Sequence, residues 1–323
     1  MNASQHIQQL VKTELHEFEE KFKLAAKSRV SLLDRIMQYI IKRKGKQVRP
    51  MFVFLSAKLF GPVTEDTHRA AALVELLHTA TLVHDDVVDE SMERRGFFSI
   101  NALWKNKIAV LVGDYLLSKG LLLSLKHNDF NTLKILSEAV EKMSEGELLQ
   151  IEKTRKLNLS EDVYFEIIKN KTASLLSSAC AAGAWSTTND LEITEQMKLF
   201  GEKAGIAFQI KDDLFDYGSE SIGKPTGNDI KEKKLTLPLI YTLNTVSKDK
   251  KRELIYILKN ENRHKKYVQQ VIDEVIKAGG ITYATEKMNQ YRDEAIALLH
   301  QFPENDIRNG LESLVRFTTD RKY

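Results

Sequence analysis

The stretch AAALVELLHTATLVHDDVVDE, residues 70–90, decides the fold class of this chain. Its apolar residues recur at intervals of three and four rather than two, which is the period of an α-helix. They include Leu73, Val74, Leu77, Ala80, Leu82 and Val83. We therefore predict a buried helix of about six turns, at 3.6 residues per turn, which begins after the turn signal Gly61-Pro62.

The same spacing continues through nearly the whole chain and predicts a second long helix at 191–217. With 5 prolines and 15 glycines in 323 residues, the chain has few obligatory helix breaks. No alternating strand and no linker is visible, so we expect one all-α domain over residues 1–323, with a surface loop at 218–235. Further helices are expected at 4–24, 29–43, 50–60, 100–126, 131–152, 161–186, 238–246, 249–259, 264–278, 281–301 and 307–317.

The composition argues against several classes of protein. A formal charge of +3 is nearly balanced, so no nucleic acid is expected as a partner. The N-terminal residues lack the apolar core of a signal peptide, and no uncharged apolar run reaches the roughly 18 residues that a membrane span needs. Cys180 is the only cysteine, so an intrachain disulfide is excluded. We expect a buried Cys180 and a cytoplasmic protein.

Two clusters of aspartates share one spacing. On a helix, the first and last aspartate of each cluster lie one turn apart on the same face. Like charges held together near the negative end of a helix dipole cost free energy, so a cation is expected to offset them. The clusters are HDDVVDE, with Asp85, Asp86 and Asp89, and KDDLFDY, with Asp212, Asp213 and Asp216.

Magnesium is the natural cation, since it prefers oxygen and commonly uses a few carboxylates plus the phosphates of a substrate. Calcium fits less well, because neither cluster has the twelve-residue loop with a central glycine of an EF-hand. Zinc fits poorly, because no cysteine pair or histidine pair is near. The plainest alternative is two solvated acidic helix ends.

Several basic side chains accompany the aspartates. Arginine matches phosphate oxygens in pairs and lysine supplies a point charge, so these residues suit diphosphate groups. Taken singly, such residues are usually only solvated, and their significance lies in a shared pattern. They are Lys46, Arg49, Arg94, Arg95, Lys171, Lys224 and Lys234.

Six sequence elements occur in the order found in trans-prenyl diphosphate synthases, and they extend from about residue 45 to 240. A lone Asp-Asp-x-x-Asp element would say little, whereas six ordered elements are specific. HTATLVHDDVVDES and VLVGDYLLS most resemble the bacterial octaprenyl and heptaprenyl synthases. The elements are GKQVRP, HTATLVHDDVVDESMERRG, VLVGDYLLSKG, KTASLL, FQIKDDLFDY and GKPTGNDIKEKKLTLPL.

The resemblance implies a bundle of antiparallel helices around a central cavity, and a homodimer. It implies that both aspartate clusters hold Mg²⁺ against an allylic diphosphate. The residues implied to bind that diphosphate are Arg94, Lys171, Lys224 and Lys234. Those implied to bind isopentenyl diphosphate are Lys46, Arg49, His78 and Arg95. Thr172 and Gln209 would lie near the developing carbocation.

Some positions depart from the family pattern or allow a plainer interpretation. Lys44 precedes Gly45 where a second glycine is common, Gln47 stands where a base is common, and Asn228 stands where an acid is common. Asp229 follows Asn228. A lone histidine on an apolar helix is often a core residue, which is the alternative for His78. His84, beside Asp85, is expected to support the cluster only.

The implied reaction is ionisation of the allylic diphosphate, attack by the double bond of isopentenyl diphosphate, and loss of a proton to the released diphosphate. No serine–histidine–acid or cysteine–histidine arrangement in the sequence calls for a protein nucleophile. The 218–235 loop is expected to close over the site and exclude water. Contact with a membrane is expected only through a greasy product.

Product length is expected to depend on the helix that carries Asp85. Five and four positions before Asp85 lie Ala80 and Thr81, which are small, and one turn deeper lies Leu77. An open first turn favours a product beyond farnesyl, and the resemblance points to about six to ten isoprene units. A geranylgeranyl or farnesyl synthase is the alternative within the family.

Three other functions remain as alternatives. A terpene cyclase would need one diphosphate substrate, whereas the basic residues here suit two. A non-catalytic partner subunit tends to lose aspartates from one cluster, and both are intact. A purely structural helical protein would leave two costly acidic helix ends without a reason.

Overall fold

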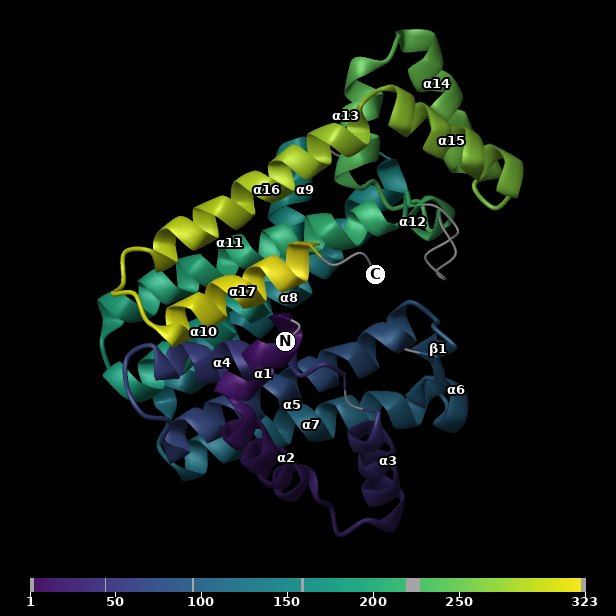
Figure 1. Cartoon of the computed structure of the whole chain (residues 1–323). Helices are drawn as coiled ribbons and strands as arrows, with labels where there is room; N and C mark the ends of the chain where they lie inside the picture. Colours follow the sequence, from purple (N-terminus) through teal and green to yellow (C-terminus); the bar gives the residue numbers. More distant parts are fainter. Residues whose placement is uncertain (1–2, 44, 95, 158–159, 219–226, 321–323) are drawn as a thin grey trace. The chain divides into compact units, whose positions relative to one another are not determined.

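The computed structural model describes residues 3–43, 45–94, 96–157, 160–218 and 227–320. These residues are almost entirely helical (Figure 1), so the all-α prediction is confirmed. Within the described ranges, the only sheet is a hairpin of two strands with two residues each, and it was not predicted. It pairs β1 (Glu93–Arg94) with antiparallel β2 (Phe97–Phe98), and Arg94 lies opposite Phe97.

The chain divides into two compact units, which are described separately below. Four of the division points fall inside helices that were predicted as continuous. Whether these units make the single domain expected over residues 1–323 stays a prediction. Unit 1 comprises Met1–Val140, Ser178–Lys198 and Glu304–Leu311, and unit 2 comprises Glu141–Ser177, Leu199–Pro303 and Glu312–Tyr323. The helices that run through both are α8 (Phe130–Lys156), α10 (Ser174–Thr188), α11 (Leu191–Phe215) and α17 (Asp306–Asp320).

Unit 1 is built around α5 (Glu65–Val88), against which α2, α4, α6 and α7 pack. Helix α5 begins five residues earlier than predicted, because Thr64 and Thr67 form a capping box that satisfies the first free N–H groups. The other helices of this unit are α1 (Ala3–Leu10), α2 (Lys12–Ala26), α3 (Ser31–Lys42), α4 (Val48–Lys58), α6 (Ile100–Trp104) and α7 (Asn106–Lys126).

Two predicted helices of unit 1 are each broken into two. The predicted helix 4–24 is interrupted at Val11 between α1 and α2. The predicted helix 100–126 is interrupted at Lys105, whose φ of 73° lies in the left-handed region that helices do not adopt. Apolar spacing continues through both breaks, which is why the sequence pattern did not reveal them.

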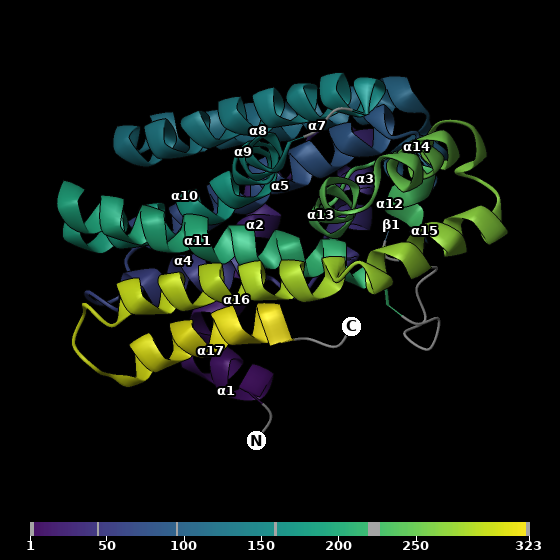
Figure 2. The same cartoon turned by 90° about the horizontal axis from the view of Figure 1, so that it is seen from above.

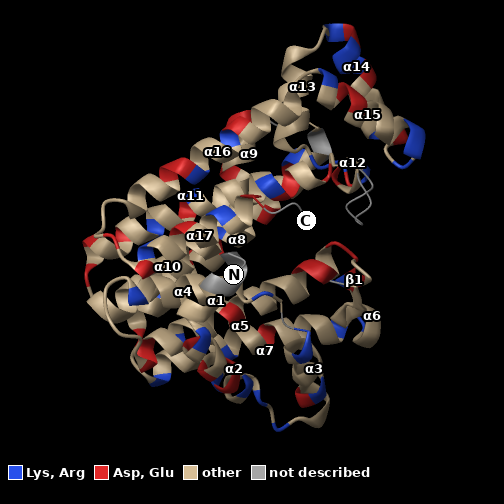
Figure 3. Cartoon of the chain, viewed as in Figure 1, with Lys and Arg blue, Asp and Glu red and all other residues tan. Residues whose placement is uncertain are grey.

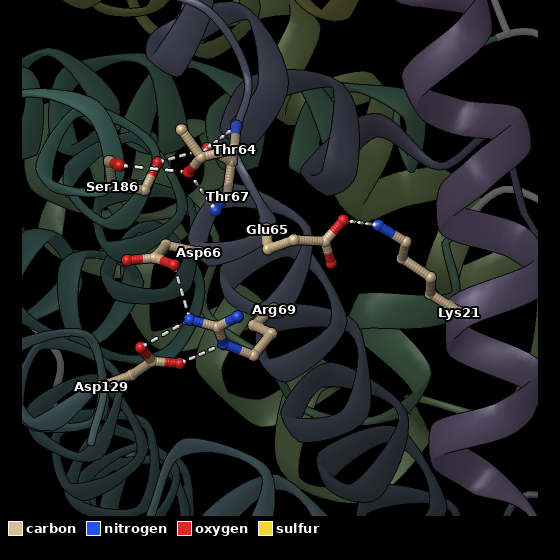
Figure 4. Close-up of polar contacts among 8 residues, drawn as sticks. All are labelled: Lys21, Thr64, Glu65, Asp66, Thr67, Arg69, Asp129 and Ser186. Carbon is tan, nitrogen blue, oxygen red and sulfur yellow. Dashed lines mark hydrogen bonds and ion pairs between the residues drawn. The ribbon is translucent and has the colours of Figure 1, made fainter. Parts of the chain in front are cut away.

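Side-chain contacts anchor the start of α5 from three directions (Figure 4). Arg69 donates from Nε to Asp129 Oδ2 at 2.6 Å and from an NH2 group to Asp129 Oδ1 at 3.0 Å, which is a bidentate pair. Lys21 of α2 reaches Glu65 at 2.6 Å, and the Thr67 and Ser186 hydroxyls are 2.7 Å apart. These contacts fix the position of the beginning of α5.

Helices α5 and α7 approach closely at two glycines. A Cβ at Gly120 would lie 2.7 Å from Leu73 Cδ1, and one at Gly113 would lie 2.1 Å from His84 Nε2. The His84 ring instead meets the Val110 carbonyl at 3.2 Å and Asp114 Oδ1 at 3.5 Å. His84 thus joins α5 to α7. It supports the aspartate cluster by fixing the position of the helix that carries it.

Unit 2 contains a core packed largely from α9, α13, α15 and α16, together with the end of α11. Within the predicted loop 218–235, residues 219–226 lie outside the described ranges, and the remainder includes a short helix, α12 (Asn228–Lys231). The other elements are α9 (Glu161–Ile168), the π-helix η1 (Lys169–Ala173), α13 (Leu237–Thr245), α14 (Lys248–Tyr256), the π-helix η3 (Ile257–Glu261), α15 (Lys265–Lys277) and α16 (Gly280–Leu299).

One segment of the described chain, Ile100–Lys126, is long and apolar enough to cross a membrane by length and composition alone. It is α6 and α7 taken together, and 33% of its most apolar window is buried. The sequence predicts no such segment, because charges such as Asp114 interrupt the apolar run. Core helices of soluble proteins pass the same test of length and composition.

Candidate active site

The first aspartate cluster lies at the C-terminal end of α5, as expected. Asp85 and Asp86 belong to its last turn, and Asp89 is the residue that ends the helix, with its N–H donated to the Asp85 carbonyl at 2.8 Å. Asp85 is half-buried and Asp89 is exposed, whereas Asp86 is only 3% exposed. The middle aspartate therefore has a different environment from the two that share a face.

Asp86 pairs with Arg94 from the hairpin. Its Oδ1 accepts hydrogen bonds from Arg94 Nε at 2.8 Å and from an Arg94 NH2 group at 2.7 Å. Its backbone carbonyl accepts from the buried Asn101 amide at 3.1 Å. This buried carboxylate thus ties the hairpin to α5, although Asp86 was predicted as a metal ligand and Arg94 as a phosphate ligand. Arg95 lies outside the described residues.

His78 and Arg49, both predicted to bind isopentenyl diphosphate, are in contact although 29 residues separate them. Arg49 NH1 lies 2.8 Å from His78 Nε2, and His78 is buried. Because a guanidinium only donates, His78 Nε2 must accept, and the neutral ring then carries its proton on Nδ1. Lys46 is exposed, in the turn before α4, where Gln47 has a left-handed φ of 53°.

A cavity of about 310 Å³ lies within unit 1, beside α5. His78, Asp86 and Arg94 line it, together with aromatic residues of α2, α3 and β2. Its size is at the lower end of the range for small-molecule pockets. The structure thus brings three predicted site residues from α5 and the hairpin to one cavity.

The residues predicted to set product length are on α5. Ala80 and Leu77 are buried, and the Thr81 hydroxyl donates to the His78 carbonyl at 2.9 Å. Leu77 Cδ2 is 3.7 Å from the place a Gly120 Cβ would take. Leu121 and Leu125 of α7 are 44% and 48% exposed and do not belong to the core of unit 1.

The second aspartate cluster lies at the end of α11, in unit 2. Asp213 is 7% exposed, and both its oxygens accept: Oδ2 from the Tyr164 hydroxyl at 2.6 Å and Oδ1 from the Gln209 amide at 2.8 Å. Asp216 follows the helix and accepts the backbone N–H groups of Asn228 at 2.7 Å and Asp229 at 3.0 Å. These two N–H groups begin α12, so Asp216 acts as its cap.

Burial and crowding raise the pKa values of these carboxyl groups. Burial raises the pKa of Asp213 to about 7, although the hydrogen bonds from Tyr164 and Gln209 favour the charged form. Burial, with the nearby charges of Asp213 and Asp216, raises the pKa of Asp229 to about 8. Burial also raises the pKa of Asp216. Burial therefore disfavours the charged forms of these carboxyl groups, and a bound cation would stabilise them.

A π-helix presents the lysine and threonine predicted to act in catalysis. In η1 the backbone is wider than in an α-helix, and two glycines make room for it. A Cβ at Gly146 would lie 2.8 Å from the Lys171 nitrogen, and one at Gly205 would lie 2.6 Å from the Ala173 Cα. The KTASLL element therefore adopts this shape because its neighbours lack side chains at the points of contact.

Polar contacts link η1 to α8 and α11. The Lys171 ammonium forms an ion pair with Glu147 and donates to Gln150 Oε1 at 3.4 Å. The Thr172 hydroxyl donates to Gln209 Oε1 at 2.8 Å, and the amide group of Gln209 donates in turn to Asp213. Thr172, Gln209, Asp213 and Tyr164 consequently form one hydrogen-bonded chain.

A second cavity, of about 130 Å³, lies within unit 2 and gathers most of the predicted residues of this unit. The predicted ones that line it are Lys171, Thr172, Gln209, Asp213 and Lys234. Sequence reasoning missed Gln150 and Tyr164, which carried no motif signal, and noted Asp229 only as the residue after Asn228. Lys224 lies outside the described residues.

Among the described residues, no group of three or more histidine, cysteine and acidic side chains is arranged as a ready-made metal site. The donor sets nonetheless fit magnesium, which needs one or two carboxylates when substrate phosphates complete its shell. The buried, crowded carboxylates of unit 2 support this fit. Asp85 and Asp89 in unit 1, and Asp212 and Asp216 in unit 2, are the members that would hold it.

Comparison with known proteins agrees with this chemistry. The family model described as polyprenyl synthetase matches residues 30–275. The chain is 35% identical over 297 residues to an all-trans-nonaprenyl-diphosphate synthase of Rhodobacter capsulatus, covering 91% of this chain and 90% of that protein. It is 32% identical over 297 residues to the octaprenyl diphosphate synthase of Escherichia coli, covering 91% of each.

A solved structure shares the fold over nearly the whole chain. The polyprenyl synthase of Caulobacter crescentus, complexed with calcium and isoprenyl diphosphate, superimposes with a TM-score of 0.91 at 33% identity. The match covers 99% of this chain and 98% of that one. The expected isoprenoid synthase fold is thereby confirmed. With the match of its family model over most of its length, this chain belongs to the polyprenyl synthetase family.

Proposed function

We propose that this protein is a trans-prenyltransferase that condenses isopentenyl diphosphate with an allylic diphosphate to give a medium- or long-chain all-trans polyprenyl diphosphate. The observation that carries the proposal is the unit 2 cavity, where Lys171, Lys234 and Asp213 meet the dipoles of Thr172 and Gln209. Cations there suit a departing diphosphate, and oriented dipoles suit a carbocation. Family membership supports the same chemistry.

The allylic diphosphate is assigned to Lys171 and Lys234, with Arg94 and Lys224 as the further ligands that the resemblance implies. Magnesium bound by Asp85, Asp89, Asp212 and Asp216 would neutralise charge that develops on the leaving diphosphate. Glu147 and Gln150 hold the Lys171 ammonium in place beforehand, so little reorganisation is needed when the diphosphate arrives.

Isopentenyl diphosphate is assigned to Lys46, Arg49, His78 and Arg95. The contact between Arg49 and His78 supports this assignment, because it joins two of these residues, and His78 also lines the cavity beside α5. With its proton on Nδ1, His78 orients the Arg49 guanidinium by accepting from it. A guanidinium has the planar fork of donors that matches phosphate oxygens in pairs.

In the reaction, the carbon–oxygen bond of the allylic diphosphate breaks, and the double bond of isopentenyl diphosphate attacks the cation. The attack leaves a tertiary cation on the isopentenyl unit, and loss of a proton from the neighbouring carbon to the released diphosphate forms the new double bond. Thr172 and Gln209 stabilise the cation through their dipoles, and Gln209 keeps its orientation because Asp213 accepts from its amide. No side chain needs to form a covalent bond with the substrate.

A product assay tests the proposal. The purified protein is incubated with magnesium, farnesyl diphosphate and labelled isopentenyl diphosphate, and the products are separated by chain length. A ladder ending in one long product is the expected outcome. A single C20 product would make it a geranylgeranyl synthase, and no incorporation by a folded protein would favour a cyclase or a non-catalytic subunit.

We also propose that two copies of the chain pair through the outer face of α7. Val110, Leu111, Leu121, Leu122 and Leu125 are each at least 40% exposed and recur at helical spacing. Asp114 and Ser118 lie between the two apolar groups on this face, and large exposed apolar side chains on one helix face favour contact with a second copy. Sedimentation should show a dimer, and the double change Leu121→Glu and Leu125→Glu should give monomers, whereas Leu191→Glu on the exposed start of α11 should not.

We place the enzyme in the cytoplasm. Its single cysteine supports this assignment, because Cys180 is buried and burial raises the pKa of its thiol to about 12. Such a thiol forms no disulfide and reacts slowly.

A further inference from the structure

A strongly basic segment lies in unit 2, and none of its residues lines either cavity described above. Residues 248–266 contain eight lysines and arginines and three acids, a formal charge of +5 against +3 for the whole chain. Outside this segment the chain is therefore slightly acidic. Figure 3 shows Lys and Arg gathered at the start of α14 and at the start of α15.

The basic residues share an exposed surface. Lys248, Arg252, Tyr256 and Lys259 follow one another at spacings of four, four and three, so they lie on one face of α14 and η3. All four are exposed, Tyr256 by 59%. The exposed residues of the next turn, Arg263, His264, Lys265 and Lys266, continue the set. We call these eight residues the α14–α15 basic surface.

The opposite face of the same helices is apolar and buried. Leu254, Ile257 and Leu258 belong to the core of unit 2, as do Val268 and Val271 of α15. Figures 1 and 2 both show α14 and α15 side by side at one end of α13. The basic surface is thus held on a packed scaffold, and its residues are exposed.

The acids of the segment neutralise little of this surface. Glu253 pairs with Lys250, which lies off the surface, at 2.7 Å, and Glu261 lies 3.6 Å from His264. Asp249 reaches Arg252 at 3.3 Å, but both side chains are more than three-quarters exposed, so water screens this pair. Within the described residues, the structure records no ion pair for Lys248, Arg263 or Lys266.

We propose that the α14–α15 basic surface docks the enzyme on an anionic phospholipid bilayer. Clusters of four to eight lysines and arginines on a helix suit anionic lipid headgroups, and an exposed tyrosine suits the interface. This inference rests on the proposed function, because a long polyprenyl diphosphate has an apolar chain that water does not hold. A bilayer at the enzyme's surface accepts that chain, where a membrane-bound prenyl transfer reaction consumes it.

A nucleic acid is the other polyanion that such a surface would attract. The chain as a whole is nearly neutral, and the surface holds one exposed aromatic residue rather than the row on which successive bases stack. The product supplies a reason for a bilayer and none for a nucleic acid. The bilayer is therefore the occupant to which the proposal commits.

Vesicle sedimentation tests the proposal with the full chain. Vesicles of phosphatidylcholine alone are compared with vesicles that also contain phosphatidylglycerol, at low and at high salt. We expect binding only to the anionic vesicles, and its loss at high salt, since charge attraction is screened. Equal binding to both compositions, or no binding to either, would overturn the proposal.

Matched variants locate the surface. Combining Lys248→Glu, Arg252→Glu, Lys265→Glu and Lys266→Glu should reduce binding to anionic vesicles at least tenfold. The same change of net charge elsewhere, with Lys12→Glu, Lys27→Glu, Arg29→Glu and Lys134→Glu, should leave most of it. An equal loss in both variants would mean that overall charge, not this surface, is responsible.

Two further measurements, of synthase activity and of competition by RNA, distinguish failure of the docking proposal from failure of the proposed function. Synthase activity measured in detergent should be the same in the wild type and the α14–α15 variant, so a loss of binding with activity kept supports docking. Failure of synthesis by a wild type that still binds anionic vesicles would overturn the proposed function and leave the surface standing. Displacement of anionic vesicles by a low concentration of single-stranded RNA would show a nucleic-acid surface instead.

Discussion

The two aspartate clusters share one spacing but have different environments. In each, the middle aspartate is the buried one: Asp86 is 3% exposed and Asp213 is 7% exposed. Asp86 is met by a guanidinium, that of Arg94, whereas Asp213 is met by the neutral donors of Tyr164 and Gln209. In the first cluster an arginine opposes the negative charge. In the second, burial raises the pKa values of Asp213 and Asp216, so a proton or a bound cation must offset the charge.

The two clusters are alike in which aspartate is buried, and they differ in how its charge is balanced. In both clusters the middle aspartate anchors the surrounding structure, to the hairpin in unit 1 and to α9 in unit 2. The outer aspartates, which share a helix face, are then the ones suited to a metal. We infer that an Asp-Asp-x-x-Asp element does two tasks, and that unit 2 depends more strongly on a bound cation.

The largest expected effect is on activity. Asp85→Asn and Asp212→Asn should each lower kcat/KM about 10³-fold, because each removes a carboxylate expected to hold magnesium at the leaving diphosphate. Steady-state assays over a range of magnesium concentrations check this, with circular dichroism to confirm folding. Activity within tenfold of the wild type in either variant would remove that residue from the metal site.

We expect product length to change with a substitution on α5 and not with one on α11. Ala80→Tyr places a ring in a buried position five residues before Asp85, so the dominant product should become shorter while turnover continues. Chromatography of the products measures this. Gly201→Ala, on α11, serves as the control on the other helix and should not shorten the product, and an unchanged length in the Ala80 variant would refute the role of α5.

The two anchors should differ in stability. Asp86→Asn removes the charge opposite Arg94 and should lower the free energy of unfolding by about 2 kcal/mol, less than a fully buried pair because Arg94 is partly exposed. Tyr164→Phe removes one hydrogen bond to Asp213 and should cost about 1.5 kcal/mol. Urea unfolding compares them, and the reverse order would break the distinction between charged and neutral anchors.

The smallest expected effect is the pH dependence of unit 2 without metal. Because the folded pKa values of Asp213 (about 7) and Asp229 (about 8) lie well above the usual value for aspartate, the folded state binds protons more tightly. Their contribution is therefore most favourable at low pH and is lost as pH rises from about 4 towards 8.

Melting temperatures in the presence of a chelator check this sign. Asp229→Asn should raise the melting temperature relative to the wild type at pH 8, and the gain should shrink towards pH 5. Magnesium with inorganic diphosphate should reduce the gain at pH 8, because a bound cation stabilises the charged form. A gain that is constant with pH would indicate that Asp229 is not held with a raised pKa.

Particular residues show how far prediction from the sequence reached. The helical ends that carry Asp85 and Asp212 follow from apolar spacing, which is a local property. The breaks at Val11 and Lys105 did not follow, because apolar spacing continues through them. The hairpin at Glu93–Phe98 was missed because two-residue strands show no alternation.

Within the site, residue types and order identified Lys171, Thr172 and Gln209 through the resemblance, and the structure brings them to one cavity. Tyr164 escaped because it lies 49 residues from Asp213, in an element without a motif. The π-helix escaped because its cause is the absence of side chains at Gly146 and Gly205, on neighbouring helices. Arg95 and Lys224 stay predictions.

The sequence by itself determined the helical class, the spacing of both aspartate clusters and the family, since these depend on periodicity and on ordered motifs along the chain. Only the tertiary structure decided which aspartate of each cluster is buried, which partner meets it and how strongly its charge is opposed. The physical reason is that burial and hydrogen bonding are set by residues distant in sequence, and two identical local patterns therefore acquire different electrostatics once different helices pack around them.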